Sequence, residues 1–259
     1  MNIDVVISQQ DIEYFVLILV RITSFVFIAP FFGMSNTPQR TKLGLSIFLS
    51  LIFFNILPDK TVEYSTLMEY TTIVVKEAVA GLLIGFSAYI CSTIILFSGR
   101  MIDMDIGLSM ANMFDATTKQ QSTVTGSLYN YFILLLMLLS DMHTFLISAM
   151  KDSFTLIPIG DLSVNSTMYE TFIGFLTNYF VIGFRIVLPV FVAILILNCA
   201  LGIMTKIAPQ IHMFAVGIQL KVLGGLLILF LTISLLPTIA NYIFTVMQEM
   251  VISVMKGML

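Results

Sequence analysis

The chain has 259 residues, of which 58% are hydrophobic and only 10% charged, and its formal net charge is −3 at pH 7. Soluble domains carry about 25% charged residues, so this composition excludes an ordinary soluble protein and predicts a polytopic membrane protein. The small net charge, without any basic cluster, argues against nucleic acid as a partner and leaves the lipid bilayer as the expected surroundings.

The sequence predicts an all-α integral membrane protein with about six long, partly kinked apolar helices arranged as helical hairpins. The expected apolar runs cover residues 14–33, 43–57, 72–98, 128–149, 172–201 and 214–244. We expect one membrane-embedded domain over 1–259, in which a central polar segment, 100–126, separates the runs of 1–99 from those of 127–259.

The lengths of these runs are uneven. Residues 43–57 would span roughly 22 Å as a helix, whereas residues 72–98 would span roughly 40 Å, against a hydrocarbon core about 30 Å thick. Tilt or kinking at Pro189 and Pro237 would absorb part of the mismatch. Alternatively, some of these apolar helices are buried against partner subunits and never face lipid.

The central segment contains a small amphipathic patch. Ile106, Met110, Met113 and Phe114 recur at helical spacing among small residues. Two interpretations stay open: an ordinary connector outside the bilayer, or a gate or plug.

Ionisable residues also occur within the apolar runs. They are Arg21, Glu77, Asp141, Arg185 and Lys221. Because charges at such depth are costly, they usually face another helix, a partner or water. We expect Arg21 to pair with Glu77, and Asp141 and Arg185 to find each other or a neighbouring subunit. A charge swap of Arg21 and Glu77 would test the first pairing, and an ion or proton relay is the alternative.

Other motifs predict packing rather than catalysis. Gly81 and Gly85 form a GxxxG pattern that lets helix backbones approach closely. The two histidines, His143 and His212, lie far apart without companions, so we expect no metal site. No nucleotide-binding motif and no recognisable nucleophile–base spacing is present, so we expect no cofactor and no enzymatic activity.

Residues 197–225 carry the most specific pattern in the chain. Leu201-Gly202, the basic Lys206, Ala208-Pro209-Gln210 and then Phe214 and Gly217 closely resemble the FliR family of flagellar biosynthesis and type III secretion export-gate proteins. The resemblance extends over most of the chain. Further matching positions are Arg21, Pro30, Gly33, Pro38, Arg40, Lys76, Glu77, Gly81, Gly85, Gly99, Asp103, Gly107, Ser109, His143, Ser153, Phe154 and Pro158.

Three positions depart from the family pattern. Lys206 stands where Arg is usual, Met142 where Gly is common before the family's His, and Ala116 where Pro is common after Asp115. Lys keeps the charge of Arg but lacks its bidentate fork. We expect the second change to alter a tight helix contact, and the third to leave the central segment more mobile.

The resemblance implies a subunit of a membrane export gate. In this family the subunit assembles with FliP and FliQ, works with FlhB and FlhA, and helps surround a channel for unfolded flagellar export substrates in the cytoplasmic membrane. The loop between the third and fourth runs forms part of the pore plug. Carried over, that loop is residues 107–121, with Gly107, Met110, Met113, Phe114 and Asp115 as the gating residues and Gly202, Lys206, Pro209 and Gln210 as a family-motif loop.

The alternative from another functional class is a stand-alone secondary transporter or ion channel that uses the intramembrane charges. Uneven run lengths and the lack of an internal repeat favour the export-gate interpretation.

Overall fold

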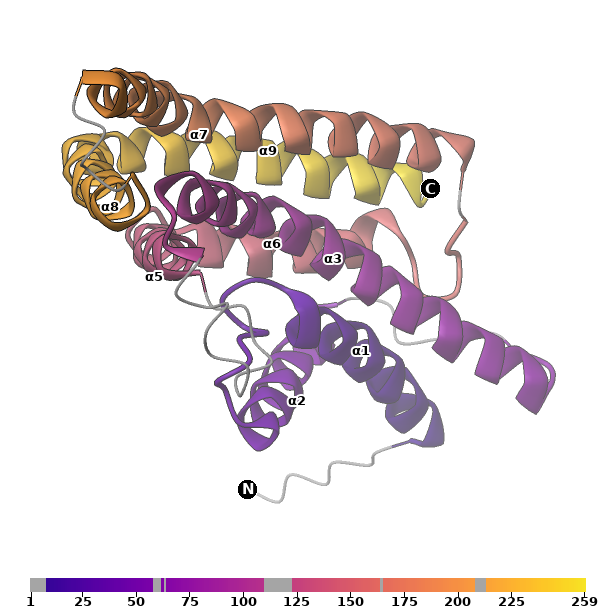
Figure 1. The fold of residues 1–259 in the computed structure, drawn as a ribbon. Coiled ribbons are helices and arrows are strands. Elements are labelled where there is room, and N and C mark those ends of the chain that lie inside the picture. Colours follow the sequence, from indigo (N-terminus) through magenta and orange to yellow (C-terminus); the bar gives the residue numbers. More distant parts are fainter. Residues whose placement is uncertain (1–7, 58–61, 63, 110–122, 164, 208–212) are drawn as a thin grey trace. The chain divides into compact units, whose positions relative to one another are not determined.

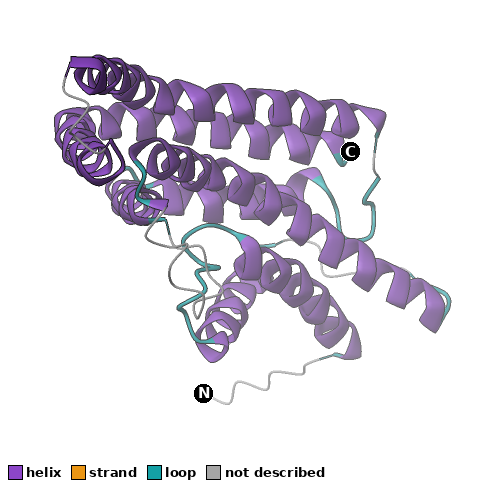
Figure 2. Cartoon of the chain, in the orientation of Figure 1, coloured by secondary structure: helices purple, strands orange, loops and turns teal. Residues whose placement is uncertain are grey.

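The computed structural model describes residues 8–57, 62, 64–109, 123–163, 165–207 and 213–259, and its regular elements are helices (Figures 1 and 2). Those elements are α1 (Gln9–Ile28), α2 (Gln39–Ile56), α3 (Leu67–Ile106), α5 (Val124–Leu139), α6 (Met142–Leu156), α7 (Ser166–Ile207), α8 (Met213–Thr232), the 3₁₀ helix η1 (Ile233–Leu235) and α9 (Leu236–Gly257). The predicted all-α fold is confirmed.

Local chemistry fixes where several helices begin and end. At the start of α1, the Ser8 hydroxyl accepts from the Asp11 backbone N–H at 3.1 Å, and Asp11 Oδ2 accepts from the Ser8 N–H at 3.0 Å, which is a capping box. The helix ends before Pro30, because the residue before a proline is driven out of the α-helical region. At the start of α3, Glu69 Oε2 accepts from the Ser65 N–H at 2.6 Å.

Two of the predicted apolar runs are broken into separate helices. The run at 128–149 is divided by Ser140 and by Asp141, whose φ of 55° is left-handed, so α5 and α6 meet at a bend of 69°. The run at 214–244 is interrupted by η1, and Pro237 follows as the second residue of α9, where a missing N–H costs little.

The central segment is shorter than predicted. Helix α3 continues through Arg100 to Ile106, and α5 already begins at Val124, so the predicted loop 100–126 contracts at both ends. The reason is that Ile102, Asp103 and Ile106 are all buried, which keeps the last turns of α3 helical despite their charged residues.

Among the residues that the structure describes, three helical segments are long and apolar enough to cross a membrane: Leu67–Ile106, Met168–Ile207 and Gly217–Gly257. A fourth exists if the bent pair α5–α6 counts as one span. Buried residues make up 50% of the most apolar window of the first segment, but only 28% and 11% of the other two. Much of the apolar surface of α7 and α8 is therefore left uncovered by this chain, whereas α9 buries many of its apolar residues.

The chain divides into two compact units, and α3, α7 and α9 each contribute to both. The first unit comprises residues 1–91, 141–175 and 245–259. In it α1 and α2 lie side by side (Figure 1). The ring of Phe54 contacts those of Tyr14 and Phe15, with centroids 6.2 and 6.0 Å apart. The second unit comprises residues 92–140 and 176–244, with Phe97 packed against Tyr179 and Phe180.

Candidate functional site

The most elaborate polar arrangement in the first unit is a buried ion pair between α1 and α3. The guanidinium of Arg21 donates from Nε to Glu77 Oε2 at 2.5 Å and from a terminal nitrogen to Oε1 at 3.0 Å. The side chains are 0% and 1% exposed. The predicted pairing of Arg21 with Glu77 is confirmed, and its bidentate geometry is the strongest form of this interaction.

The remaining donor capacity of Arg21 is directed at the end of α6. Its Nη1 donates to the backbone carbonyls of Ser153 and Ile157, both at 3.1 Å. The guanidinium carbon lies 4.3 Å from the centroid of the Phe154 ring, within cation–π range. The Ser153 carbonyl also accepts from the Ile157 backbone N–H at 2.9 Å, so Arg21 adds a second hydrogen bond there and supplies a donor to the carbonyl of Ile157, the C-cap residue of α6.

Glu77 receives a further hydrogen bond from the loop after α6. Its Oε1 accepts from the Gly160 backbone N–H at 3.0 Å, and the neighbouring Lys76 donates from Nζ to the Gly160 carbonyl at 2.9 Å. The side chains of Arg21, Glu77 and Lys76 and the backbone groups they bind form one network that joins α1, α3, the end of α6 and this loop. Because each charge is hydrogen-bonded both to its counterion and to backbone groups of this chain, the arrangement favours a structural role over an ion or proton relay.

The predicted GxxxG pattern lies directly beside this network. A Cβ added at Gly81 would overlap the backbone carbonyl of Arg21, and one at Gly85 would lie 3.0 Å from the carbonyl oxygen of Phe25. These two glycines therefore let α3 approach the backbone of α1 closely enough for Glu77 to reach Arg21.

The other predicted intramembrane charges are placed differently. Asp141 lies at the break between α5 and α6 and is exposed, and Arg185 is exposed on α7, so a contact of either with a neighbouring subunit stays a prediction. Asp141 escapes burial because it occupies a turn rather than a helix interior. The two residues belong to different compact units, and their pairing stays a prediction. Lys221 is half-buried on α8.

Arg185 lines an apolar pocket of about 320 Å³ within the second unit. Pro189 on the same helix and Leu235 and Tyr242 near the start of α9 also line it. The pocket lies where Pro189 interrupts the hydrogen bonding of α7 and where η1 joins α8 to α9.

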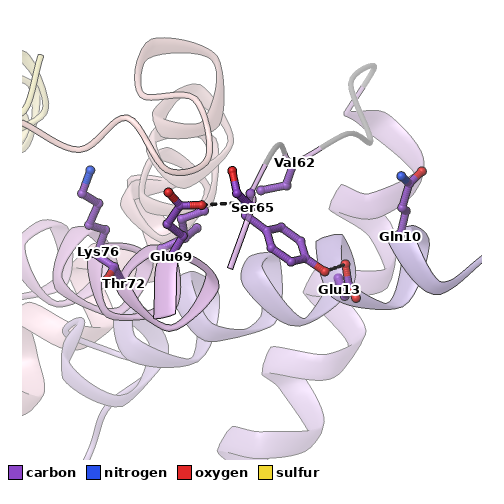
Figure 3. A pocket seen from close by; sticks show the side chains of 9 residues that line it. Gln10, Glu13, Val62, Ser65, Glu69, Thr72 and Lys76 are labelled. Atoms are coloured by element: carbon purple, nitrogen blue, oxygen red, sulfur yellow. Dashed lines mark hydrogen bonds between the residues drawn. The ribbon is translucent and has the colours of Figure 1, made fainter. Parts of the chain in front are cut away.

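A larger, open pocket of about 840 Å³ lies between the first turns of α1 and α3 (Figure 3). Its carboxylates are engaged by donors of this chain: Glu13 accepts from the Tyr64 hydroxyl at 2.7 Å, and Glu69 accepts from Ser65. The Tyr64 hydrogen bond, followed by that of Gln9, lowers the pKa of Glu13 below its ordinary value. These groups tie the two helix ends together.

The predicted plug is only partly described. Gly107 follows α3 with a φ of 91°, a conformation that favours glycine. Met110, Met113, Phe114 and Asp115 lie outside the described residues. Their gating role stays a prediction.

The predicted family-motif loop begins later than expected. Gly202 and Lys206 belong to the last turns of α7, which continues to Ile207, so the loop does not begin at Gly202. Pro209 and Gln210 lie outside the described residues. At Met142, where the family often has Gly, the thioether is buried and accepts from Gln248 Nε2 at 3.2 Å.

Two features of the site escaped prediction from the residues alone. The contact of Arg21 with the carbonyls of Ser153 and Ile157 could not be predicted from residue types, because every residue has a backbone carbonyl. Ser153, Phe154 and Pro158 were nevertheless among the positions that resemble the family. The buried carboxylate of Asp103 was noted only for that resemblance, yet it accepts from the backbone N–H of Thr125. Within the described part of the chain, no three His, Cys, Asp or Glu side chains are grouped to hold a metal ion.

Comparison with known proteins connects these features to a family. The family described as bacterial export proteins, family 1, matches residues 12–257. A flagellar biosynthetic protein FliR of Bacillus subtilis is 30% identical over 238 residues, 91% of this chain and 92% of that protein. The FliR of Aquifex aeolicus is 30% identical over 92% of this chain and 93% of its own length, and that of Escherichia coli K12 is 26% identical over 88% and 87%. Since the family match covers nearly the whole sequence, this chain belongs to the bacterial export proteins, family 1.

Proposed function

We propose that this chain is a non-catalytic structural and gating subunit of the bacterial flagellar type III protein export channel. The observation that carries the proposal is the family match over residues 12–257, together with relatives named flagellar biosynthetic protein FliR that align along about nine-tenths of the chain. The chain would help to form and seal the pore through which unfolded flagellar subunits pass, within the basal body in the cytoplasmic membrane.

The partners in this proposal are FliP and FliQ in the core gate, with FlhB and FlhA. Exposed apolar side chains support it. On α7 they include Phe180, Phe184, Leu188, Phe191 and Leu195. Such a continuous apolar surface has to be covered by lipid or by other subunits. The short, exposed face of α2, with Phe48 and Leu51, fits burial against protein better than a full crossing of a bilayer.

The charge network argues against a stand-alone transporter. A relay needs a charged group that can change partners, whereas Arg21 and Glu77 are buried and hydrogen-bonded to each other and to backbone groups of this chain. Energy for export would come from partner subunits, because the sequence has no nucleotide-binding motif.

The gating role is tested by measuring ion leakage and flagellar export in cells that carry a deletion of residues 107–121. We expect leakage with continued export, because removal of a plug opens a pore without dismantling its wall. Unchanged impermeability would overturn the plug assignment. Unchanged export together with unchanged impermeability would make the segment a simple connector.

A matched pair of substitution variants tests the sealing role without changing the length of the loop, as the deletion does. Replacing Met110, Met113 and Phe114 together by serine removes the apolar surface that we expect to seal the pore, since methionine and phenylalanine pack adaptably against varied neighbours. Replacing Thr117, Gln120 and Gln121 by serine alters as many positions in the same segment and serves as the control. We expect leakage in the first variant only.

A further inference from the structure

The apolar pocket of about 320 Å³ between the middle of α7 and the start of α9 has a polar end and an apolar end. Arg185, Thr238 and Tyr242 line this pocket but not the smaller cavity, of about 20 Å³, that adjoins it. Four residues line both spaces and so form the opposite, apolar end: Ile186, Pro189, Leu235 and Ile239. A pocket with this division suits an amphipathic ligand.

The three polar side chains at this pocket have no partner among the described residues. Neither the Arg185 guanidinium nor the hydroxyl groups of Thr238 and Tyr242 make a hydrogen bond or ion pair there. The described carboxylates of the second unit, Asp103 and Asp105, both lie at the end of α3. Because a charge on an apolar helix is costly without a counterion, Arg185 needs an anion from outside the second unit.

The position of Arg185 along α7 matches the level of lipid headgroups. Between Arg185 and Lys206, the helix carries no charged side chain over residues 186–205. This stretch is roughly 30 Å long as a helix, which equals the thickness of one hydrocarbon core. Arg185 therefore lies at one edge of that core, and Tyr242 at the same pocket is a residue type enriched at membrane interfaces. Pro189, at the apolar end of the pocket, lies inside the core.

The pocket lies on a different face of α7 from the apolar surface that we assign to partner subunits. Successive residues of an α-helix are turned by about 100° around its axis. Phe184 and Leu188 therefore share one face, whereas Ile186 and Pro189 share another that lies on the far side of the helix axis. A lipid in the pocket leaves the first face free for subunit contacts.

We propose that this pocket binds an anionic phospholipid, with the phosphate at Arg185 and an acyl chain along Pro189 and Leu235. A guanidinium donates two parallel hydrogen bonds to a phosphate, and the hydroxyl groups of Thr238 and Tyr242 supply donors for further headgroup oxygens. Basic pockets between membrane helices bind anionic headgroups in this way. Lipid binding here requires only that α7 lies in a bilayer, and it is independent of the gating role proposed for residues 107–121.

Lipid binding is measured by native mass spectrometry of the purified export complex, with dioleoylphosphatidylglycerol and dioleoylphosphatidylcholine as the anionic and zwitterionic probes. Arg185→Gln should weaken retention of phosphatidylglycerol by about fivefold or more, the effect of one lost cation near a membrane surface, and leave phosphatidylcholine unchanged. Arg185→Lys keeps the charge and should restore most of the retention. Arg100→Gln removes an exposed cation of the same unit outside the pocket, and this control should match the native complex.

A second variant tests the apolar end of the pocket. Leu235→Phe adds volume there while it keeps Arg185, so it should also weaken retention of phosphatidylglycerol. Native retention in either Arg185→Gln or Leu235→Phe would overturn the proposal, as would equal retention of the two lipids by the native complex. If the Arg185→Gln complex falls apart where the Arg185→Lys complex assembles, the counterion is a carboxylate of a partner subunit and the lipid site is wrong.

Discussion

Arg21 and Glu77 lie 56 positions apart in the sequence and form a bidentate ion pair with almost no exposed side-chain surface. The pair is asymmetric in its surroundings. The cation faces two helix-terminal carbonyls, and the anion faces a backbone N–H. The backbone carbonyls suit only a cation, and the backbone N–H suits an anion, so Arg21 and Glu77 cannot trade places without losing these hydrogen bonds.

The asymmetry changes the test of this pair. A charge swap would place a carboxylate beside the carbonyls of Ser153 and Ile157, so we expect the swapped double variant to stay defective although the pair exists. Neutralisation is a sharper test. Arg21→Met or Glu77→Gln alone leaves one buried charge unpaired and should cost about 3–5 kcal/mol of stability.

The double variant Arg21→Met/Glu77→Gln should be more stable than the sum of the single effects predicts, because no buried charge is left without its counterion. The measurement is the temperature at which half of the detergent-solubilised complex aggregates. Arg40→Met, at an exposed position, is the control and should leave this temperature unchanged. Additive single effects would contradict energetic coupling between Arg21 and Glu77.

The glycines of α3 give a second prediction. Gly81→Ala should lower stability by about 1–3 kcal/mol, the usual effect of overpacking, because the added methyl group meets backbone that cannot rotate away. Gly44→Ala on α2 is the matched control: no atom lies within 4 Å of the added Cβ, and a stabilisation of about 0.5–1 kcal/mol is expected for an exposed helix interior. The same aggregation temperature reports both. Equal effects at the two positions would refute close packing at Gly81.

The pKa of Glu13 provides a prediction on pH. This pKa lies below its ordinary value of 4.5, chiefly because Glu13 accepts a hydrogen bond from Tyr64. The stabilisation of the folded state by this contact is therefore present above pH 4.5 and is lost as pH falls through the lowered pKa. Tyr64→Phe should raise the pKa of Glu13 towards 4.5, as measured by carbon-13 NMR of the labelled carboxyl group. Tyr70→Phe is the control, because its hydroxyl bonds the Glu13 backbone carbonyl and not the carboxylate. A pKa unchanged by Tyr64→Phe would remove the hydrogen bond as the cause.

The reactivity of the two cysteines can show whether partner subunits cover the exposed face of α7. Cys199 is exposed on α7, whereas Cys91 is fully buried in α3. In detergent, a maleimide should modify Cys199 of the isolated chain, and modification should be at least about tenfold slower in the assembled complex if partners cover α7. Cys91 should stay unmodified in both samples until the chain is unfolded. Equal reactivity of Cys199 in the two samples would place its face of α7 outside the subunit contacts.

The sequence by itself determined the class of protein, because low charge content and long apolar runs are properties of composition and local order. It also predicted the Arg21–Glu77 pair and the small-residue face at Gly81 and Gly85. Those predictions were possible because an ionisable residue in an apolar run requires a partner, and because glycine spacing on one helix is visible without knowing its neighbour.

Only the tertiary structure decided what else contacts those residues. The carbonyls of Ser153 and Ile157 are present in any sequence, and their role follows from where α6 ends beside Arg21. The exposure of Asp141 depends on a left-handed turn that divides an otherwise continuous apolar run. Asp103 and Asp105 look equivalent in sequence, yet Asp103 accepts from the Thr125 N–H in the first turn of α5, whereas Asp105 Oδ2 has no hydrogen-bond partner among the described residues. Backbone groups carry no residue identity, so contacts made through them emerge only once the helices are packed.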